Sequence, residues 1–135
     1  MINYPPKVIL ALGEAIDGND KLFYWLMKNG YPELAALANS IQSNEEAFDW
    51  LMKNGFQSFA AMSNAIDEDK KSYYWLKKHN FELLMIICDA SMGDDFSMKW
   101  LEERNLKEFI HLCLKIRAKK LEQKRDYSDY HKIHF

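Results

Sequence analysis

The sequence has no long apolar run. Its longest uninterrupted apolar stretch, residues 83–88, is six residues, whereas a helix needs about 20 to span a bilayer. The N-terminus also lacks a basic segment followed by an apolar core, which is the pattern of a secretory signal. We therefore expect no transmembrane helix and a cytoplasmic location.

Cysteine is scarce, with only two in the chain. Neither has a histidine or an acidic residue at the spacing of a zinc site, so we predict no metal centre. No arrangement of residues commits the chain to a reaction or a cofactor, and we expect a protein without catalytic or cofactor-binding residues. An enzyme of unknown class is the alternative, and it would need Glu14, His79, Asp89 or His111 to gather in one cleft.

Composition favours a single folded domain. The chain has 135 residues, of which 48% are hydrophobic and 14% aromatic, and this is enough apolar material for one core. Charge is distributed unevenly, because residues 1–105 hold 10 basic and 16 acidic residues and residues 106–135 hold 8 and 4. A net charge of −6 is therefore followed by one of +4.

Tryptophan marks a tandem repeat. The only tryptophans are Trp25, Trp50, Trp75 and Trp100, and each opens a related hexapeptide, from Trp-Leu-Met-Lys-Asn-Gly in the first to Trp-Leu-Glu-Glu-Arg-Asn in the fourth. A unit of 25 residues cannot bury its own apolar face, so it must stack on its neighbours. We divide the chain into units 6–30, 31–55, 56–80 and 81–105, followed by a capping helix and tail over 106–135.

Each unit predicts two helices of about 11 and 10 residues, and isolated helices of that length are marginal in water. In the first helix, apolar residues recur three and four positions apart, as at Ile9, Leu12 and Ile16. The alanines and other small residues beside them make this helix approachable, so it should be the more deeply buried of the pair.

Polar turns are predicted to bound the second helix. Asn or Asp stands where a side chain caps the N-terminus, at Asn19, Asn44, Asp69 and Asp94. A residue able to adopt a left-handed conformation stands where the helix ends, at Gly30, Gly55, Asn80 and Asn105. Asparagine is the only residue that replaces glycine at these positions, and this supports the interpretation.

The two cysteines belong to a column of small residues in the first helix, which contains Gly13, Ala38, Ser63, Cys88 and Cys113. Equivalent residues of stacked helices lie about 8–10 Å apart. This separation is beyond the ~7 Å between Cα atoms that a disulfide tolerates. We therefore expect two reduced thiols at a close helix crossing.

The tryptophan column is predicted to be a core ladder rather than an aromatic box for a ligand, because every unit carries the ring at the same place. The indole rings would then be the largest apolar contribution to the stack. Truncating a buried tryptophan typically costs about 3–5 kcal/mol. The stability lost in Trp50→Ala or Trp75→Ala would therefore be a large part of the free energy of unfolding of a whole domain, which is about 5–15 kcal/mol.

Two columns outside the predicted core are candidates for binding a partner. The first keeps a polar residue beside the apolar stripe of the first helix, at Glu14, Asn39, Asn64 and Asp89. The second places Tyr24 and Tyr74 on the second helix. Polar groups in a row supply donors and acceptors for a peptide, and tyrosine gives contact area at low entropic cost. Alternatively, the polar groups fix the turn between the helices and the tyrosines pack along a neighbouring helix.

The last segment departs from the repeat. Residues 106–116 resemble a fifth first helix, but no turn follows and the helical pattern continues through residues 117–125. Its basic residues include Lys115, Arg117, Lys119, Lys120, Lys124 and Arg125. They shield the edge of the last unit or, as the alternative, bind the phosphates of a nucleic acid or an anionic membrane. We do not expect nucleic acid as the partner, because the rest of the chain is acidic and would repel a long polyanion.

Residues 126–135 form an aromatic tail that is too apolar for a plain disordered end. Its large apolar side chains are Tyr127, Tyr130, Ile133 and Phe135. The tail is expected to fold back over the final helices or to insert into another molecule. His131 and His134 are three residues apart, but without an acidic or thiol partner we assign no metal site to them.

An open stack of units has two apolar ends. Val8, Ile9 and Leu12 of the first helix would have no preceding unit to cover them. This end and the tail are therefore candidate surfaces for a homo-oligomer.

In architecture, residues 6–116 resemble the short helical hairpins of ankyrin-like and HEAT-like solenoids. The Thr-Pro-Leu-His signature and the period of about 33 residues of ankyrin repeats are missing, and so is the period of about 34 residues of tetratricopeptide repeats. The resemblance implies a role in protein interaction. We predict an all-α fold, a right-handed solenoid of four hairpins with a capping helix. It is expected to bind an unknown protein or peptide along a repeat surface, as an interaction or scaffold module.

Overall fold

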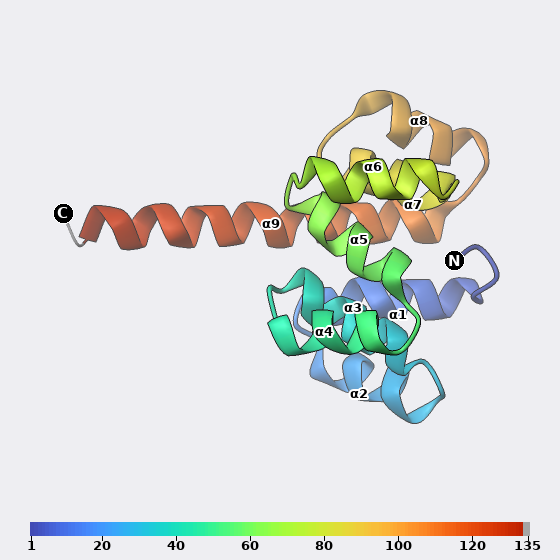
Figure 1. Cartoon of the computed structure of the whole chain (residues 1–135), viewed down its shortest axis with the longest axis horizontal. Coiled ribbons are helices and arrows are strands. Elements are labelled where there is room, and N and C mark those ends of the chain that lie inside the picture. The colour runs from blue at the N-terminus through green and yellow to red at the C-terminus, as the bar shows by residue number, and fades with distance from the viewer. Residues whose placement is uncertain (134–135) are drawn as a thin grey trace.

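The computed structural model describes residues 1–133, and the side chains of residues 1–129. The described residues form nine helices and no strand: α1 (Pro6–Ile16), α2 (Asp20–Lys28), α3 (Pro32–Ile41), α4 (Glu45–Lys53), α5 (Gln57–Ile66), α6 (Lys70–Lys78), α7 (Glu82–Ser91), α8 (Asp95–Glu103) and α9 (Lys107–Ile133) (Figure 1). The all-α class predicted from the sequence is confirmed. Within the described range, no helix has both the length and the apolar character of a membrane span.

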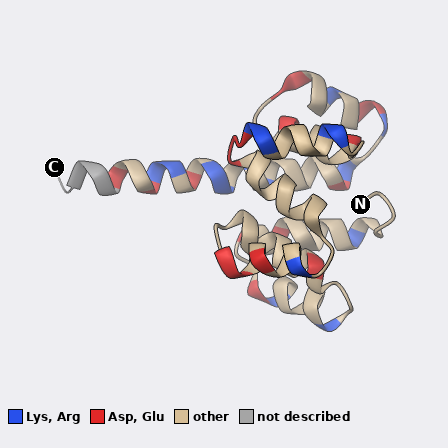
Figure 2. Cartoon of the chain, in the orientation of Figure 1, with Lys and Arg blue, Asp and Glu red and all other residues tan. Residues whose placement is uncertain are grey.

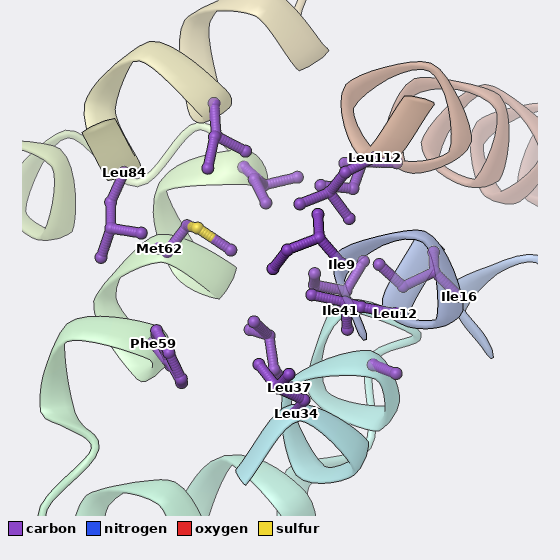
Figure 3. Close-up of a cluster of buried hydrophobic side chains, with 14 of the residues drawn as sticks. Ile9, Leu12, Ile16, Leu34, Leu37, Ile41, Phe59, Met62, Leu84 and Leu112 are labelled. Atoms are coloured by element: carbon purple, nitrogen blue, oxygen red, sulfur yellow. The ribbon is translucent and has the colours of Figure 1, made fainter. Parts of the chain in front are cut away.

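Odd-numbered helices form the inside of the molecule and even-numbered helices the outside. Helices α1, α3, α5 and α7 each bury at least five residues, whereas α2, α4 and α6 each bury a single leucine. Each even-numbered helix packs against the odd-numbered helices before and after it. The expectation that the first helix of each pair is the more deeply buried is confirmed. Aliphatic side chains from α1, α3, α5, α7 and α9 meet in the shared core (Figure 3).

The chain closes on itself through α9. Successive odd-numbered helices pack side by side from α1 to α9, and α9 then packs against α1 more extensively than any other two helices pack together. Val8, Ile9 and Leu12 are consequently buried. The expectation that these residues form an exposed apolar end is wrong, because α9 covers α1 where a preceding unit would lie.

The tryptophans lie at the edge of the core rather than in it. Trp50 is 36% exposed and the other three are partly exposed, whereas the leucine that follows each one is fully buried. Adjacent residues point about 100° apart around a helix, so only one of the two faces the inner helices. In the first three units the ring instead stacks on the aromatic residue six positions later, as for Trp25 on Tyr31 and Trp75 on Phe81. The fourth unit has Leu106 there, and the guanidinium of Arg104 lies over the Trp100 ring at 3.7 Å. The predicted core ladder of indole rings is therefore wrong.

The turn after each even-numbered helix explains this stacking. The residues predicted to be left-handed have positive φ angles: Gly30 (89°), Gly55 (86°), Asn80 (62°) and Asn105 (55°). The next backbone N–H then bonds back to the helix, as when Phe56 donates to the carbonyl of Leu51 at 2.9 Å. This is the Schellman arrangement, which brings the residue after the turn against the last turn of the helix. The prediction of left-handed helix ends is confirmed.

The predicted caps of the even-numbered helices are also present. The side chains of Asn19, Asn44, Asp69 and Asp94 each accept a hydrogen bond from a backbone N–H of the first helical turn. These bonds satisfy donors that the helix itself leaves free. The sequence therefore places both ends of the even-numbered helices correctly.

The column of small residues lies where odd-numbered helices cross closely, as predicted. Gly13, Ala38, Ser63, Cys88 and Cys113 are all buried. The thiols of Cys88 and Cys113 each donate, at 3.7 Å, to a carbonyl of the preceding odd-numbered helix, and both cysteines are free. Burial raises the pKa of both thiols, that of Cys113 to about 12.

Candidate binding groove

The polar column of the odd-numbered helices does not form one continuous track. Glu14 faces α9, where its Oε1 lies 3.2 Å from His111 Nε2, a contact that lacks hydrogen-bond geometry. Asn39 and Asn64 line hollows between successive even-numbered helices, and Asp89 lines a wider hollow beside α6. Glu14 is thus engaged by the closure of the chain, whereas the other three residues stay at surface depressions.

The hollow at Asp89 is at least twice as large as those that Asn39 and Asn64 line. It measures about 760 Å³, against 310 Å³ at Asn39 and 270 to 380 Å³ at Asn64. Its lining residues place it where α6 meets the C-terminal ends of α5 and α7. The residues that line it, here called the α6 groove, are Ala65, Glu68, Asp69, Lys70, Tyr73, Tyr74, Lys77, Asp89 and Met92.

A hydrogen bond between Tyr73 and Asp89 spans the floor of the α6 groove. The Tyr73 hydroxyl donates to Asp89 Oδ2 at 2.8 Å, and both residues are half-buried. Burial raises the pKa of Tyr73 to about 12, and the hydrogen bond to Asp89 adds to this effect. The hydroxyl therefore remains a donor at neutral pH.

The cost of partly burying the Asp89 carboxylate is offset by one hydrogen bond and by no ion pair with another described residue. Burial raises its pKa and the charge of Asp94 adds to this, while the hydrogen bond from Tyr73 opposes it. Asp89 takes part in no ion pair within residues 1–129. A partly buried carboxylate with one donor and no cation is less stable than it would be in water.

Tyr73 and Asp89 differ together from the equivalent residues of the other units. The same two positions hold Phe23 with Asn39 and Phe48 with Asn64. The hydroxyl and the carboxylate therefore occur together only where the third unit meets the fourth, at Tyr73 and Asp89. Sequence reasoning singled out Asp89 but missed Tyr73, and this joint change was the signal that would have found it.

The two candidate tyrosines are both exposed, Tyr24 by 58% and Tyr74 by 64%. Tyr74 lines the α6 groove. Tyr24 packs edge-on against Phe23, with ring centroids 5.4 Å apart, and does not line the hollow at Asn39. Of the six candidate partner-binding residues, the structure brings Asp89 and Tyr74 into one groove.

Two of the candidate anion-binding lysines are held within the fold. Lys115 Nζ lies 2.9 Å from Asp17 Oδ2, beyond the C-terminal end of α1. Lys120 Nζ donates to the carbonyl of Ile41, the last residue of α3, and lies 2.9 Å from Asp67 Oδ1. Both cations thus tie α9 to the C-terminal ends of other helices, where the helix dipole favours positive charge.

The part of α9 that extends away from the other helices also carries basic residues (Figure 2). Lys119 pairs with Glu122 of the same helix at 3.4 Å. Arg117, Lys124 and Arg125 are exposed. Of the six candidate anion-binding residues, only these three therefore present charge outward without a short ion pair to another described residue.

Helix α9 continues unbroken to Ile133 and projects away from the other helices (Figure 1). The expectation that the tail folds back is therefore wrong for residues 126–133. The side chains of Tyr130, His131 and Ile133 and the whole of His134 and Phe135 lie outside the described residues, so the interpretations that involve them stay predictions.

The residues of the enzyme alternative are dispersed. Glu14 and His111 meet at the α1–α9 contact, and Asp89 lies in the α6 groove. His79 packs against the ring of Trp75, with centroids 4.2 Å apart. No group of three histidine, cysteine or acidic residues within the described side chains is arranged to hold a metal ion.

Comparison with protein-family models, with curated proteins and with solved structures gives no match for this chain. Its function is therefore inferred from its own residues. The α6 groove is the place where a large hollow, an exposed aromatic ring and a half-buried carboxylate coincide.

Proposed function

We propose that this protein is a non-enzymatic interaction or scaffold module, a helical-repeat solenoid of four hairpins and α9, that binds a segment of another protein in the α6 groove. The observation that carries the proposal is the groove itself, with exposed Tyr74 and Met92 in its walls and Asp89 on its floor. Binding sites are commonly concave and mainly apolar, with a few polar groups that fix the orientation of the ligand. The α6 groove has that composition.

The regular spacing of the helices supports the solenoid part of the proposal. The even-numbered helices begin at residues 20, 45, 70 and 95, and each has the same cap and a left-handed residue after its end. Repeat proteins bind through positions that differ between otherwise equivalent units. Tyr73 and Asp89 are such positions, because Phe23 and Phe48 are equivalent to the tyrosine, and Asn39 and Asn64 to the aspartate.

Exposed apolar groups support binding of a protein segment at this place. Tyr74 exposes 64% and Met92 49% of its surface. Neighbouring apolar groups at the rim of a hollow are a common mark of an interaction site. Methionine adapts its shape to a partner, and tyrosine contributes contact area with few rotatable bonds.

Selection of random peptides displayed on phage tests the proposal. Peptides enriched on the immobilised protein are synthesised, and their binding is mapped by changes in its ¹H–¹⁵N NMR spectrum. We expect changes at Tyr73, Tyr74 and Asp89, and loss of binding in Tyr74→Ala. Tyr24→Ala is the matched control, because Tyr24 is exposed at the same position of the repeat but lies outside the groove. Peptides that map elsewhere, or that bind Tyr74→Ala normally, would contradict the proposal.

The alternative function, binding of an anionic surface through α9, rests on the three outward cations Arg117, Lys124 and Arg125. Three phosphate contacts predict that log affinity falls with log salt concentration with a slope of about −2 to −3. A segment bound in the α6 groove predicts a much weaker dependence. A salt titration of any partner therefore distinguishes the two functions.

A further inference from the structure

Charge in the α6 groove is balanced at the rim and unbalanced on the floor. The exposed rim carries two acidic residues, Glu68 and Asp69, and two basic ones, Lys70 and Lys77. The half-buried floor carries Asp89 alone. The net charge of the groove is therefore −1, and it originates from the carboxylate that has no cation beside it.

The floor and the walls of the groove differ in chemistry. The apolar groups of Ala65, Met92 and the Tyr74 ring line the walls, while Asp89 offers carboxylate oxygens of which Oδ2 accepts one hydrogen bond, from Tyr73. A fitting ligand group is apolar along its length and cationic at its end. Arginine and lysine side chains have this form.

We infer that the α6 groove selects an arginine side chain of the bound segment, with its guanidinium against Asp89 and its methylene stem between Met92 and the Tyr74 ring. The inference rests on the proposed function, because it names the group that the proposed groove recognises. Arginine fits better than lysine because its planar guanidinium pairs with carboxylates through two donors and stacks on aromatic faces. The hydrogen bond from Tyr73 holds the Asp89 carboxylate in one orientation for this pairing.

The hollow in the corresponding place one repeat earlier provides an internal comparison. Asn64 and Phe48 line it, so its amide is neutral and its phenyl ring has no hydroxyl. It measures about 380 Å³, half the volume of the α6 groove. The change to tyrosine and aspartate thus coincides with the site that has room for a long side chain. Asparagine at two equivalent positions also indicates that Asp89→Asn will fold.

Two synthetic peptides test the inference, Leu-Ala-Arg-Ala-Leu with blocked ends and its counterpart with citrulline in place of arginine. Citrulline keeps the length and planarity of arginine and removes the charge. Binding is followed by ¹H–¹⁵N NMR titration of the full chain, its Asp89→Asn variant and its Asp49→Asn variant. Asp49 is an exposed acidic residue outside the groove, so it controls for a general loss of negative charge.

We expect the arginine peptide to shift the signals of Tyr73, Tyr74 and Asp89 and to bind about tenfold more tightly than the citrulline peptide, or more, because charge-assisted pairs in partly buried sites contribute that much. Asp89→Asn should abolish this preference and Asp49→Asn should retain it. Equal binding of both peptides in the groove would overturn the inference and leave the proposed function standing. Absence of any shift there at millimolar peptide would also overturn the inference, while the proposed function is decided separately by the phage-selected peptides.

Discussion

The indole ring of Trp50 lies nearly parallel to the phenyl ring of Phe56, with centroids 6.0 Å apart and 8° between the planes. The pair spans the turn at Gly55, whose φ of 86° reverses the chain between α4 and α5. The side chain that anchors α4 in the core is the neighbouring Leu51, which is fully buried. Trp50 thus packs across the turn against Phe56, while Leu51 is the residue that lies in the core.

This division of roles predicts that Leu51→Ala destabilises the protein more than Trp50→Ala. Truncating a fully buried leucine typically costs about 2–5 kcal/mol, whereas Trp50 is 36% exposed and its stacked pair contributes about 0.5–1.5 kcal/mol beyond its buried area. Urea unfolding followed by circular dichroism measures both free energies. A larger loss of unfolding free energy in Trp50→Ala than in Leu51→Ala would show that Trp50 is the more important core residue.

Gly55→Ala is expected to destabilise the protein by about 1–2 kcal/mol, the usual penalty for a left-handed residue that has a Cβ atom. A Cβ at this position meets no atom within 4 Å, so backbone strain is the only cause. The reverse change Asn80→Gly, at the equivalent turn with a φ of 62°, should leave the stability unchanged or raise it. Equal effects of the two substitutions on the urea midpoint would refute this explanation.

Lys120→Met should lower the free energy of unfolding by about 1.5–3 kcal/mol, because hydrogen bonds to charged groups contribute about that much. The ammonium group bonds to the Ile41 carbonyl and pairs with Asp67, and Asp67 is half-exposed, so the ion pair itself adds little. Lys124→Met is the control, since Lys124 is exposed on the same helix and its loss should change stability by about 0.5 kcal/mol or less. Similar values for both variants would show that Lys120 does not fix α9.

Asp89→Asn is expected to stabilise the folded protein at neutral pH. Burial raises the pKa of Asp89 in the folded state, so the folded protein binds its proton more tightly than the unfolded chain, and stability falls as the pH rises through this window. The advantage of asparagine should therefore shrink as the pH drops toward the ordinary aspartate pKa of about 3.9. Urea unfolding at pH 7 and near pH 4 measures this difference. An advantage that does not vary with pH would mean that the charge of Asp89 is not its source.

Neither Cys88 nor Cys113 should react with a thiol reagent in the native protein. Both are fully buried and burial raises both thiol pKa values, so access and thiolate formation are both suppressed. Two thiols should react once the chain is unfolded in urea. Rapid reaction of either thiol under native conditions would show that the contacts between odd-numbered helices open easily.

The sequence was most informative where a local rule determines the structure. Asn44 caps α4 and Gly55 ends the following turn because only certain residues satisfy those backbone positions. It was least informative where the outcome depends on distant packing. Whether Trp50 or Leu51 faces the core is settled by the position of α3 and α5, and the periodic pattern accommodates either.

The same limit applies to the candidate site. Asp89 stood out in the sequence as a polar residue beside the core stripe, but its partner Tyr73 belonged to a column interpreted as apolar. Glu14 belonged to the same polar column as Asp89, yet the closure by α9 gives it a different environment. Equivalent positions of a repeat share their backbone geometry, but the side chains around them differ, and the sequence pattern does not show those neighbours.

The contact between α9 and α1 fixes how many hairpins this protein contains. One more copy of the unit, inserted anywhere between α2 and α7, would displace α9 from α1 by roughly a helix-packing distance of 8–10 Å and leave Val8, Ile9 and Leu12 in water. An extended array gains or loses copies at either end with little penalty. In this chain α9 already closes the row of odd-numbered helices onto α1, so a further hairpin would separate α1 from α9.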